Sequence, residues 1–160
     1  EGGLKITLYN INGLNPSSPS IDFLNEWFFK TMHHEFAHIL HQTKNYSTDF
    51  NLISTDYQGP SWLNLESDAV ANKMGYVTCY ASYSPDEDFV EIISNYVTHA
   101  KGYWESVLAT AGEEGGDKLA RKFEIVRNYL QESWGIDIDK LRDIVQKRSA
   151  NISQLDLKTL

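Results

Sequence analysis

The amino-acid sequence predicts an α+β domain that is mainly helical, with a small sheet element near the N-terminus and a helical C-terminal part. Two patterns carry this prediction. Residues 4–11 alternate apolar and polar side chains, as a half-buried strand does. From residue 21 onward, apolar residues recur mostly at helical spacing, and glycines separate the later helical stretches. The 160 residues have the length of one domain.

The first predicted helix runs from residue 21 to about residue 42. Apolar side chains form one stripe along it, and Ser20 is a suitable N-cap. Residues 43–62 then form a long polar and aromatic loop that Gly59-Pro60 interrupts. Loops of this length inside a compact domain are usually functional or mobile, so we expect this one to form part of a pocket wall.

Two shorter segments precede the next long helix. A helix is expected from about Asn64 to Met74, because Gly75 is typical of the position just past a helix C-terminus. Tyr76 to Tyr80 consists largely of residues that are favoured in strands, and it predicts a short strand or extended segment.

The second half of the chain is predicted to be helical. Ser84-Pro85-Asp86-Glu87 has the composition of a helix start and opens a helix that runs to about Ala100. Further helices are expected at about residues 102–111, 117–133 and 138–149.

Composition narrows the classes of function. A net charge of −8 argues against a surface for nucleic acid or anionic lipid. The single cysteine, Cys79, excludes an intrachain disulfide and a metal site with several cysteines. No apolar run approaches the ~18–20 residues that span a bilayer. The chain begins Glu1-Gly2-Gly3 without a methionine or a targeting segment, so we expect it to be a piece of a longer precursor.

The segment His34-Glu35-Phe36-Ala37-His38 predicts a metal site. Residues four apart on a helix lie about 40° from each other around the axis, so both imidazoles can face one ion. Zinc accepts such nitrogens, and Glu35 is placed to take a proton from a water at the metal. Such a short motif also arises by chance on solvated helices. Here it lies in an apolar helix, where these groups would be costly to bury without partners.

Two further histidines lie close to the motif. A metzincin would carry glycine at position 41 and a third histidine at position 44, whereas this chain has His41 and Lys44. We therefore exclude the metzincin type. His41 is expected to pack beside the site or to support a ligand from outside, and His33 is expected to be solvated.

A carboxylate on a second helix is the natural third ligand. Glu87 and Glu91 are four residues apart and share a helix face, so we assign Glu87 to the metal and Glu91 to the outer N–H of a ligating histidine. The alternative for Glu87 is a capping box with Ser84, in which its carboxylate would fold back onto the helix start. Asp88 and Glu91 are the alternative ligands.

Tyr80 is a candidate catalytic residue, because a phenol near the metal can donate a hydrogen bond to an oxyanion. Tyr83 is a second candidate for this role. The chain has nine tyrosines, and simple packing is the alternative for each of them. Tyr46 and Tyr57 in the long loop are weaker candidates for substrate contact.

These motifs together resemble the zinc-binding metallopeptidases of Bacteroidetes. The resemblance rests on three segments: His34 to His38, Gly75 to Ala81, and Glu87 to Glu91. Lipoprotein members of this group are described as substrate-import-associated zinc metallohydrolases. More distantly, the spacing of the second and third segments is similar to that in the catalytic cores of anthrax lethal factor and the Pro-Pro endopeptidases. In those proteins the residue matching Glu87 ligates zinc, and the residue matching Tyr80 assists catalysis.

The resemblance implies a gluzincin-type zincin fold and a lipid-anchored location in the cell envelope. It also implies association with outer-membrane import components. We therefore expect residues 1–160 to form a single zincin-like catalytic domain, with the active-site part in 1–112 and a helical C-terminal part in 113–160.

The sequence thus predicts a metallopeptidase that binds one Zn²⁺ per chain through His34, His38 and Glu87. Glu35 is the expected base, and peptides or proteins are the expected substrates. One alternative function is a zinc-containing binding module of a nutrient-import system, whose metal site is structural or a relic. Another is a zinc hydrolase that acts on a non-peptide amide.

Overall fold

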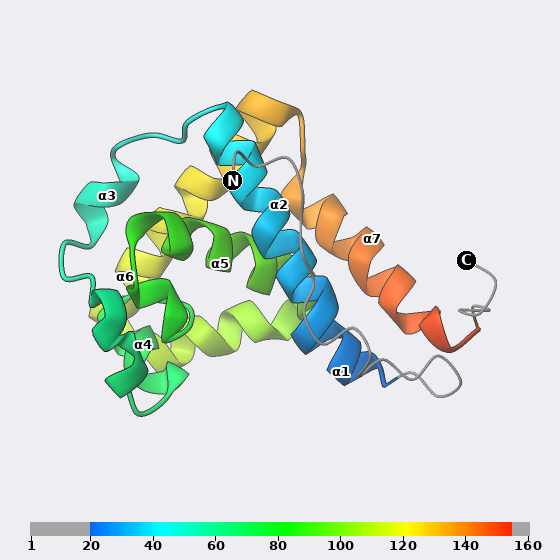
Figure 1. Cartoon of the computed structure of the whole chain (residues 1–160), viewed down its shortest axis with the longest axis horizontal. Helices are drawn as coiled ribbons and strands as arrows, with labels where there is room; N and C mark the ends of the chain where they lie inside the picture. Colours follow the sequence, from blue (N-terminus) through cyan, green and yellow to red (C-terminus); the bar gives the residue numbers. More distant parts are fainter. Residues whose placement is uncertain (1–19, 155–160) are drawn as a thin grey trace.

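A computed structural model of the chain describes residues 20–154, and these residues form a helical assembly (Figure 1). Most of the expected helices are present, with shifted ends. The elements in chain order are α1 (Ile21–Leu24), the π-helical turn η2 (Asn25–Phe29), α2 (Lys30–Thr43), α3 (Phe50–Ile53), the 3₁₀ turn η3 (Gly59–Asn64), α4 (Asp68–Met74), the 3₁₀ turn η4 (Tyr80–Ser82), α5 (Pro85–Thr98), α6 (Lys101–Trp134), α7 (Ile138–Ala150) and the 3₁₀ turn η5 (Ile152–Gln154).

The central helix is α5, which contacts α2, α6, α7 and η4. Every side chain from Asp88 to Thr98 is buried, so α5 has no solvent-exposed face over this stretch. Figure 1 shows α2 crossing one end of α5, with α6 to the left and below and α7 to the right of α2. One apolar core takes buried side chains from α2, α3, α4, α5, α6 and α7. The start of α5 is thereby held firmly opposite the middle of α2.

The predicted α+β class is wrong for the part of the chain that the structure describes. Residues 20–154 contain no strand, and the predicted strand at 4–11 lies outside them. Tyr76 to Tyr80 is a turn that enters η4. The side-chain amide of Asn72 donates to the backbone oxygens of both Tyr76 and Val77, at 2.9 Å each. These carbonyl groups are therefore satisfied without a neighbouring strand.

The two helices predicted on either side of Gly112 merge into α6, which bends at this glycine. Gly112 has φ 70° and ψ −163°, a backbone conformation that is not helical. Gly115, which the sequence predicts to lie between two helices, is part of α6. At this position α6 passes so close to α4 that only glycine fits. A Cβ atom on Gly115 would lie 2.3 Å from the Asn72 carbonyl oxygen. The apolar core continues past residue 113, and within residues 20–154 no helix is both long and apolar enough to cross a membrane.

Candidate metal centre

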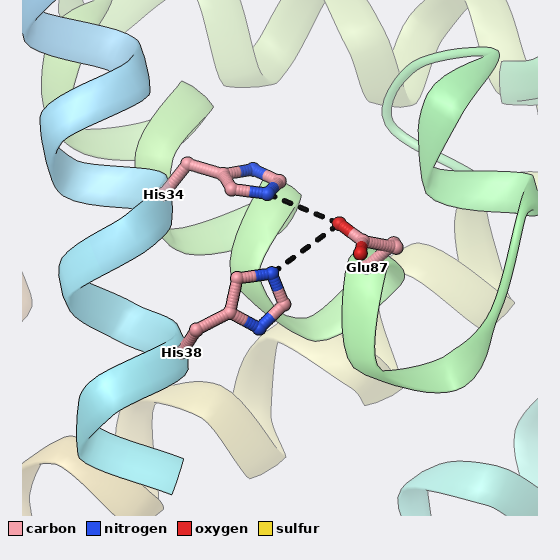
Figure 2. A group of neighbouring side chains, drawn as sticks. All are labelled: His34, His38 and Glu87. Atoms are coloured by element: carbon pink, nitrogen blue, oxygen red, sulfur yellow. Dashed lines mark ion pairs between the residues drawn. The ribbon is translucent and has the colours of Figure 1, made fainter. Parts of the chain in front are cut away.

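The two histidines of the motif lie one turn apart on the face of α2 that is turned toward α5. The Nε2 atom of His34 lies 3.0 Å from Oε2 of Glu87, and Nε2 of His38 lies 3.4 Å from the same oxygen. Figure 2 shows the two rings one above the other, with Glu87 reaching them from the start of the neighbouring helix. One ligand atom from each of the three residues lies within 4.8 Å of the other two. The structure therefore brings together the three predicted ligands.

The position of Glu87 follows from how α5 begins. Ser84 is the N-cap, and its hydroxyl accepts a hydrogen bond from the Glu87 backbone N–H at 3.3 Å. The carboxylate, however, points to the imidazoles of His34 and His38. Of the capping box, the bond from the Glu87 backbone to Ser84 is present, but the Glu87 carboxylate does not fold back onto the helix start. The side chain is therefore available for a metal.

The environment of Glu87 fits a bound cation. Its Oε2 atom is buried and has no hydrogen-bond partner among residues 20–154. Burial raises the pKa of Glu87, but the imidazoles of His34 and His38 outweigh this effect and lower it to about 2. A buried carboxylate oxygen that faces two ring nitrogens without a hydrogen bond matches the donor set of a two-histidine, one-glutamate zinc site.

Glu91 lies on the Nδ1 side of the His34 ring. Its Oε1 atom is 2.8 Å from Nδ1 of His34, and its Oε2 atom accepts hydrogen bonds from Thr78 at 2.7 Å and Asn95 at 3.1 Å. A proton on Nδ1 that is shared with Glu91 leaves Nε2 free to face Glu87. Burial lowers the pKa of His34, but the nearby carboxylates of Glu87 and Glu91 raise it to about 9. The same negative surroundings favour a metal cation.

His41 supports the second histidine in a similar way. Its Nε2 atom lies 2.9 Å from Nδ1 of His38, and the His41 ring packs edge-on against Tyr46 and Phe89. Burial lowers the pKa of His41, which favours its neutral form. A neutral His41 can accept the Nδ1–H of His38 and so fix the orientation of that ring.

Tyr80 lies at the open side of the centre. Its ring stacks on the ring of His34 with centroids 5.9 Å apart, and Trp62 packs edge-on against it. Burial raises the pKa of Tyr80, the nearby carboxylates including Glu87 and Glu35 add to this effect, and the result is a value of about 12. The phenol therefore keeps its proton at neutral pH and is a hydrogen-bond donor beside His34.

A pocket of about 360 Å³ opens beside His34 and Glu35. The loop predicted to form a wall contributes Trp62 of η3, and the turn before α5 contributes further residues. The lining residues are Lys30, Thr31, His34, Glu35, Trp62, Asp68, Thr78, Cys79, Tyr80 and Glu91. Glu35 therefore lies at the pocket, beside the candidate ligand His34.

Several other candidates have different surroundings. Asp88, one of the alternative ligands, forms an ion pair with Lys122 and accepts a hydrogen bond from Tyr57. Tyr46 bonds to Asp86 and stacks on a core phenylalanine, which is a packing role. The ring of Tyr83 lies 6.1 Å from that of Tyr80.

Four residues around the centre were not predicted from the sequence: Thr78, Asn95, Trp62 and Lys122. Asn95 follows Glu91 by four residues, so helical spacing was a usable signal for it. The others are brought to the site by tertiary packing, and nothing in the local sequence distinguishes them.

A family model described as "Putative zinc-binding metallo-peptidase" matches residues 1–139 of the chain. The chain belongs to this family. A protein with the same description, from Bacteroides caccae ATCC 43185, has a crystal structure that superposes on this chain with a TM-score of 0.82. The two sequences are 41% identical over the matched residues. The match covers 91% of this chain and 55% of that one, so this chain spans about half the length of its relative. No curated protein matches the sequence.

Membership of a zinc-binding metallopeptidase family confirms the resemblance that the three motif segments indicated. It supports a hydrolase class and a zinc cofactor, and residues 20–154 contain a His-His-Glu cluster that can hold such an ion. Association with nutrient import stays a prediction.

Proposed function

We propose that this chain is the catalytic domain of a zinc-dependent peptidase of the gluzincin type. His34, His38 and Glu87 would hold a single Zn²⁺ ion. The observation that carries the proposal is the approach of both Nε2 atoms to one buried Glu87 oxygen that lacks a hydrogen bond within residues 20–154. Three protein ligands leave a coordination position open, as catalytic zinc sites require.

The residues around the ion have distinct proposed tasks. When bound, zinc would supply Lewis-acid polarisation of the scissile carbonyl and would acidify a water molecule. Glu35, at the wall of the pocket, would accept the proton of that water and pass it to the leaving amine. Tyr80 keeps its proton and would donate a hydrogen bond to the oxyanion that forms on the carbonyl. Glu91 and His41 would hold the two ligating rings in orientation.

Peptides or proteins are the proposed substrates, which agrees with the description of the family. The pocket beside Glu35 is open and lies between η3 and α2, where an extended chain can enter. We also propose a location in the cell envelope beside import components. This part of the proposal is supported by the resemblance to lipoprotein members of the family, and cell fractionation followed by co-purification would test it.

Replacement of Glu35 by glutamine tests the proposed activity. Glu35→Gln should retain one zinc ion per chain and lose peptide hydrolysis by a factor of about 10² to 10⁴, because only the proton acceptor is removed. The measurement is cleavage of a peptide library by the purified protein, with zinc determined by elemental analysis. Glu132→Gln, an exposed substitution of the same kind in α6, is the matched control and should cleave normally.

Three outcomes would contradict the proposal. Unchanged cleavage by Glu35→Gln would exclude Glu35 as the base. A wild-type protein that binds zinc and cleaves no peptide, while it cleaves amide-linked sugars, would indicate a non-peptide hydrolase. Zinc bound without any hydrolysis, and with no water at the cobalt-substituted site, would indicate a structural metal in a binding module.

A further inference from the structure

A buried ion pair lies on the α6 side of α5. Lys122 in α6 and Asp88 in α5 are both fully buried, with Nζ 2.6 Å from Oδ2. The same ammonium group donates to the Gly75 carbonyl oxygen at 2.7 Å and lies 4.3 Å from the centroid of the Tyr76 ring. Tyr57 donates its hydroxyl hydrogen to the same Asp88 oxygen at 2.8 Å. A single lysine thus joins α6 to the start of α5 and to the turn that follows α4.

Both segments joined by this lysine carry parts of the metal centre. Asp88 directly follows Glu87 in the first turn of α5, so any shift of Asp88 also moves the candidate ligand. The turn that begins at Gly75 leads to Thr78 and Tyr80, and both of these residues line the pocket. The ion pair therefore adjoins the centre: its aspartate is next to Glu87 in the chain, and its lysine bonds to the first residue of the turn that leads to Thr78 and Tyr80.

Stability alone does not account for this pair. Removal of two charges from water is costly, and apolar residues of the same volume are often equally stabilising or more so. The Oδ1 atom of Asp88 is buried and has no hydrogen-bond partner in the described part of the chain. The partners of Oδ2 therefore fix the position of the carboxylate, but they compensate only part of the free energy that its burial costs.

We propose that Lys122 is a positioning residue for the metal centre. Through its bonds to Asp88 and Gly75, it fixes the start of α5 and the Tyr80 segment relative to the histidines of α2. The inference rests on the proposed function, because it requires that Glu87 binds the metal.

The double variant Lys122→Met, Asp88→Asn tests this role. It removes one positive and one negative charge, so the net charge stays the same and no buried charge is left alone. We expect the variant to fold with a melting temperature close to that of the wild type. Its zinc affinity, measured by competition with a chelator, should fall about tenfold or more, as is typical when residues that support metal ligands are removed. The visible spectrum of its cobalt form should also differ from the wild-type spectrum.

Arg121→Met is the matched control, since Arg121 is the preceding residue of α6 and pairs only with exposed Asp117 among residues 20–154. It should bind zinc with wild-type affinity. A folded double variant with zinc affinity within about twofold of the wild type and an unchanged cobalt spectrum would overturn the inference. If the double variant does not fold, Lys122→Met alone provides the same test, because the buried Asp88 carboxylate that it leaves can take up a proton. A weakened affinity would then support the inference, and an unchanged affinity would refute it. Failure of the wild type to bind zinc would instead refute the proposed function.

Discussion

Glu87 and Asp88 are neighbours in the first turn of α5, and they meet opposite surroundings. Glu87 faces two histidines of α2 beside a solvent-accessible pocket, and its Oε2 atom has no hydrogen bond within residues 20–154. Asp88 faces the core, where Lys122 and Tyr57 bind its Oδ2 atom. Each carboxylate faces a position that suits a cation. At Asp88 the ammonium group of Lys122 occupies this position.

The difference shows how one helix start serves two purposes. On the core side, the protein supplies its own cation, and the carboxylate is locked in position. On the pocket side, the protein supplies two imidazole rings, and no lysine or arginine among residues 20–154 pairs with Glu87, so the metal would bring the positive charge from outside. Substitutions on the pocket side should therefore change metal binding and turnover directly. Loss of a single partner of Asp88 on the core side should lower stability, because it leaves a buried charge without part of its compensation.

The largest difference between the two sides should appear when the tyrosine on each side, Tyr80 or Tyr57, is replaced by phenylalanine. Tyr80→Phe should reduce turnover about 10²- to 10³-fold, because it removes a donor to the developing oxyanion, and it should change the unfolding free energy little. Tyr57→Phe removes a hydrogen bond to a buried carboxylate and should lower the unfolding free energy by ~1.5–3 kcal/mol, with a far smaller loss of turnover. Urea unfolding and peptide cleavage, measured on both variants, check this contrast. Equal loss of turnover in the two variants would contradict the claim that the pocket side determines turnover and the core side determines stability.

A smaller effect is expected at Glu91, one helical turn beyond Glu87. Glu91→Gln keeps the shape of the side chain but weakens its hold on the Nδ1 proton of His34. Zinc affinity should fall by about 10- to 100-fold, and the metal stoichiometry at saturating zinc should stay the same. A chelator competition assay measures this change. An affinity equal to that of the wild type would show that Glu91 does not support the ligand.

The sequence predicted the histidine pair and its carboxylate partner because their spacing is local. His34 and His38 are one turn apart on a helix whose apolar pattern is clear, and Glu87 and Glu91 repeat that spacing on a second helix. The family resemblance then linked the two helices. The structure adds that the helices pack directly against each other, which allows the candidate ligands to meet.

Other features depend on contacts that the sequence pattern does not encode. The strand prediction for Tyr76 to Tyr80 failed because the side chain of Asn72, rather than a neighbouring strand, satisfies the backbone there. Lys122 lies in a helix with an ordinary mixture of charged and apolar residues, so its complete burial and its bond to Asp88 become visible only in three dimensions. Local propensity was sufficient to predict the helices, whereas the turn at Tyr76 to Tyr80 and the pair of Asp88 and Lys122 depend on tertiary contacts.

Zinc binding by the wild type and by Glu87→Ala tests the central claim most directly. Asp86→Ala is the matched control, because it removes the preceding, exposed carboxylate of the same helix turn. Titration of the three metal-free proteins with zinc should give one tightly bound ion for the wild type and for Asp86→Ala. Glu87→Ala should lose more affinity than the 10- to 100-fold typical of residues that only support ligands. Equal affinity in all three proteins would contradict the assignment of Glu87 as a zinc ligand, and absence of binding in the wild type would contradict the metal centre itself.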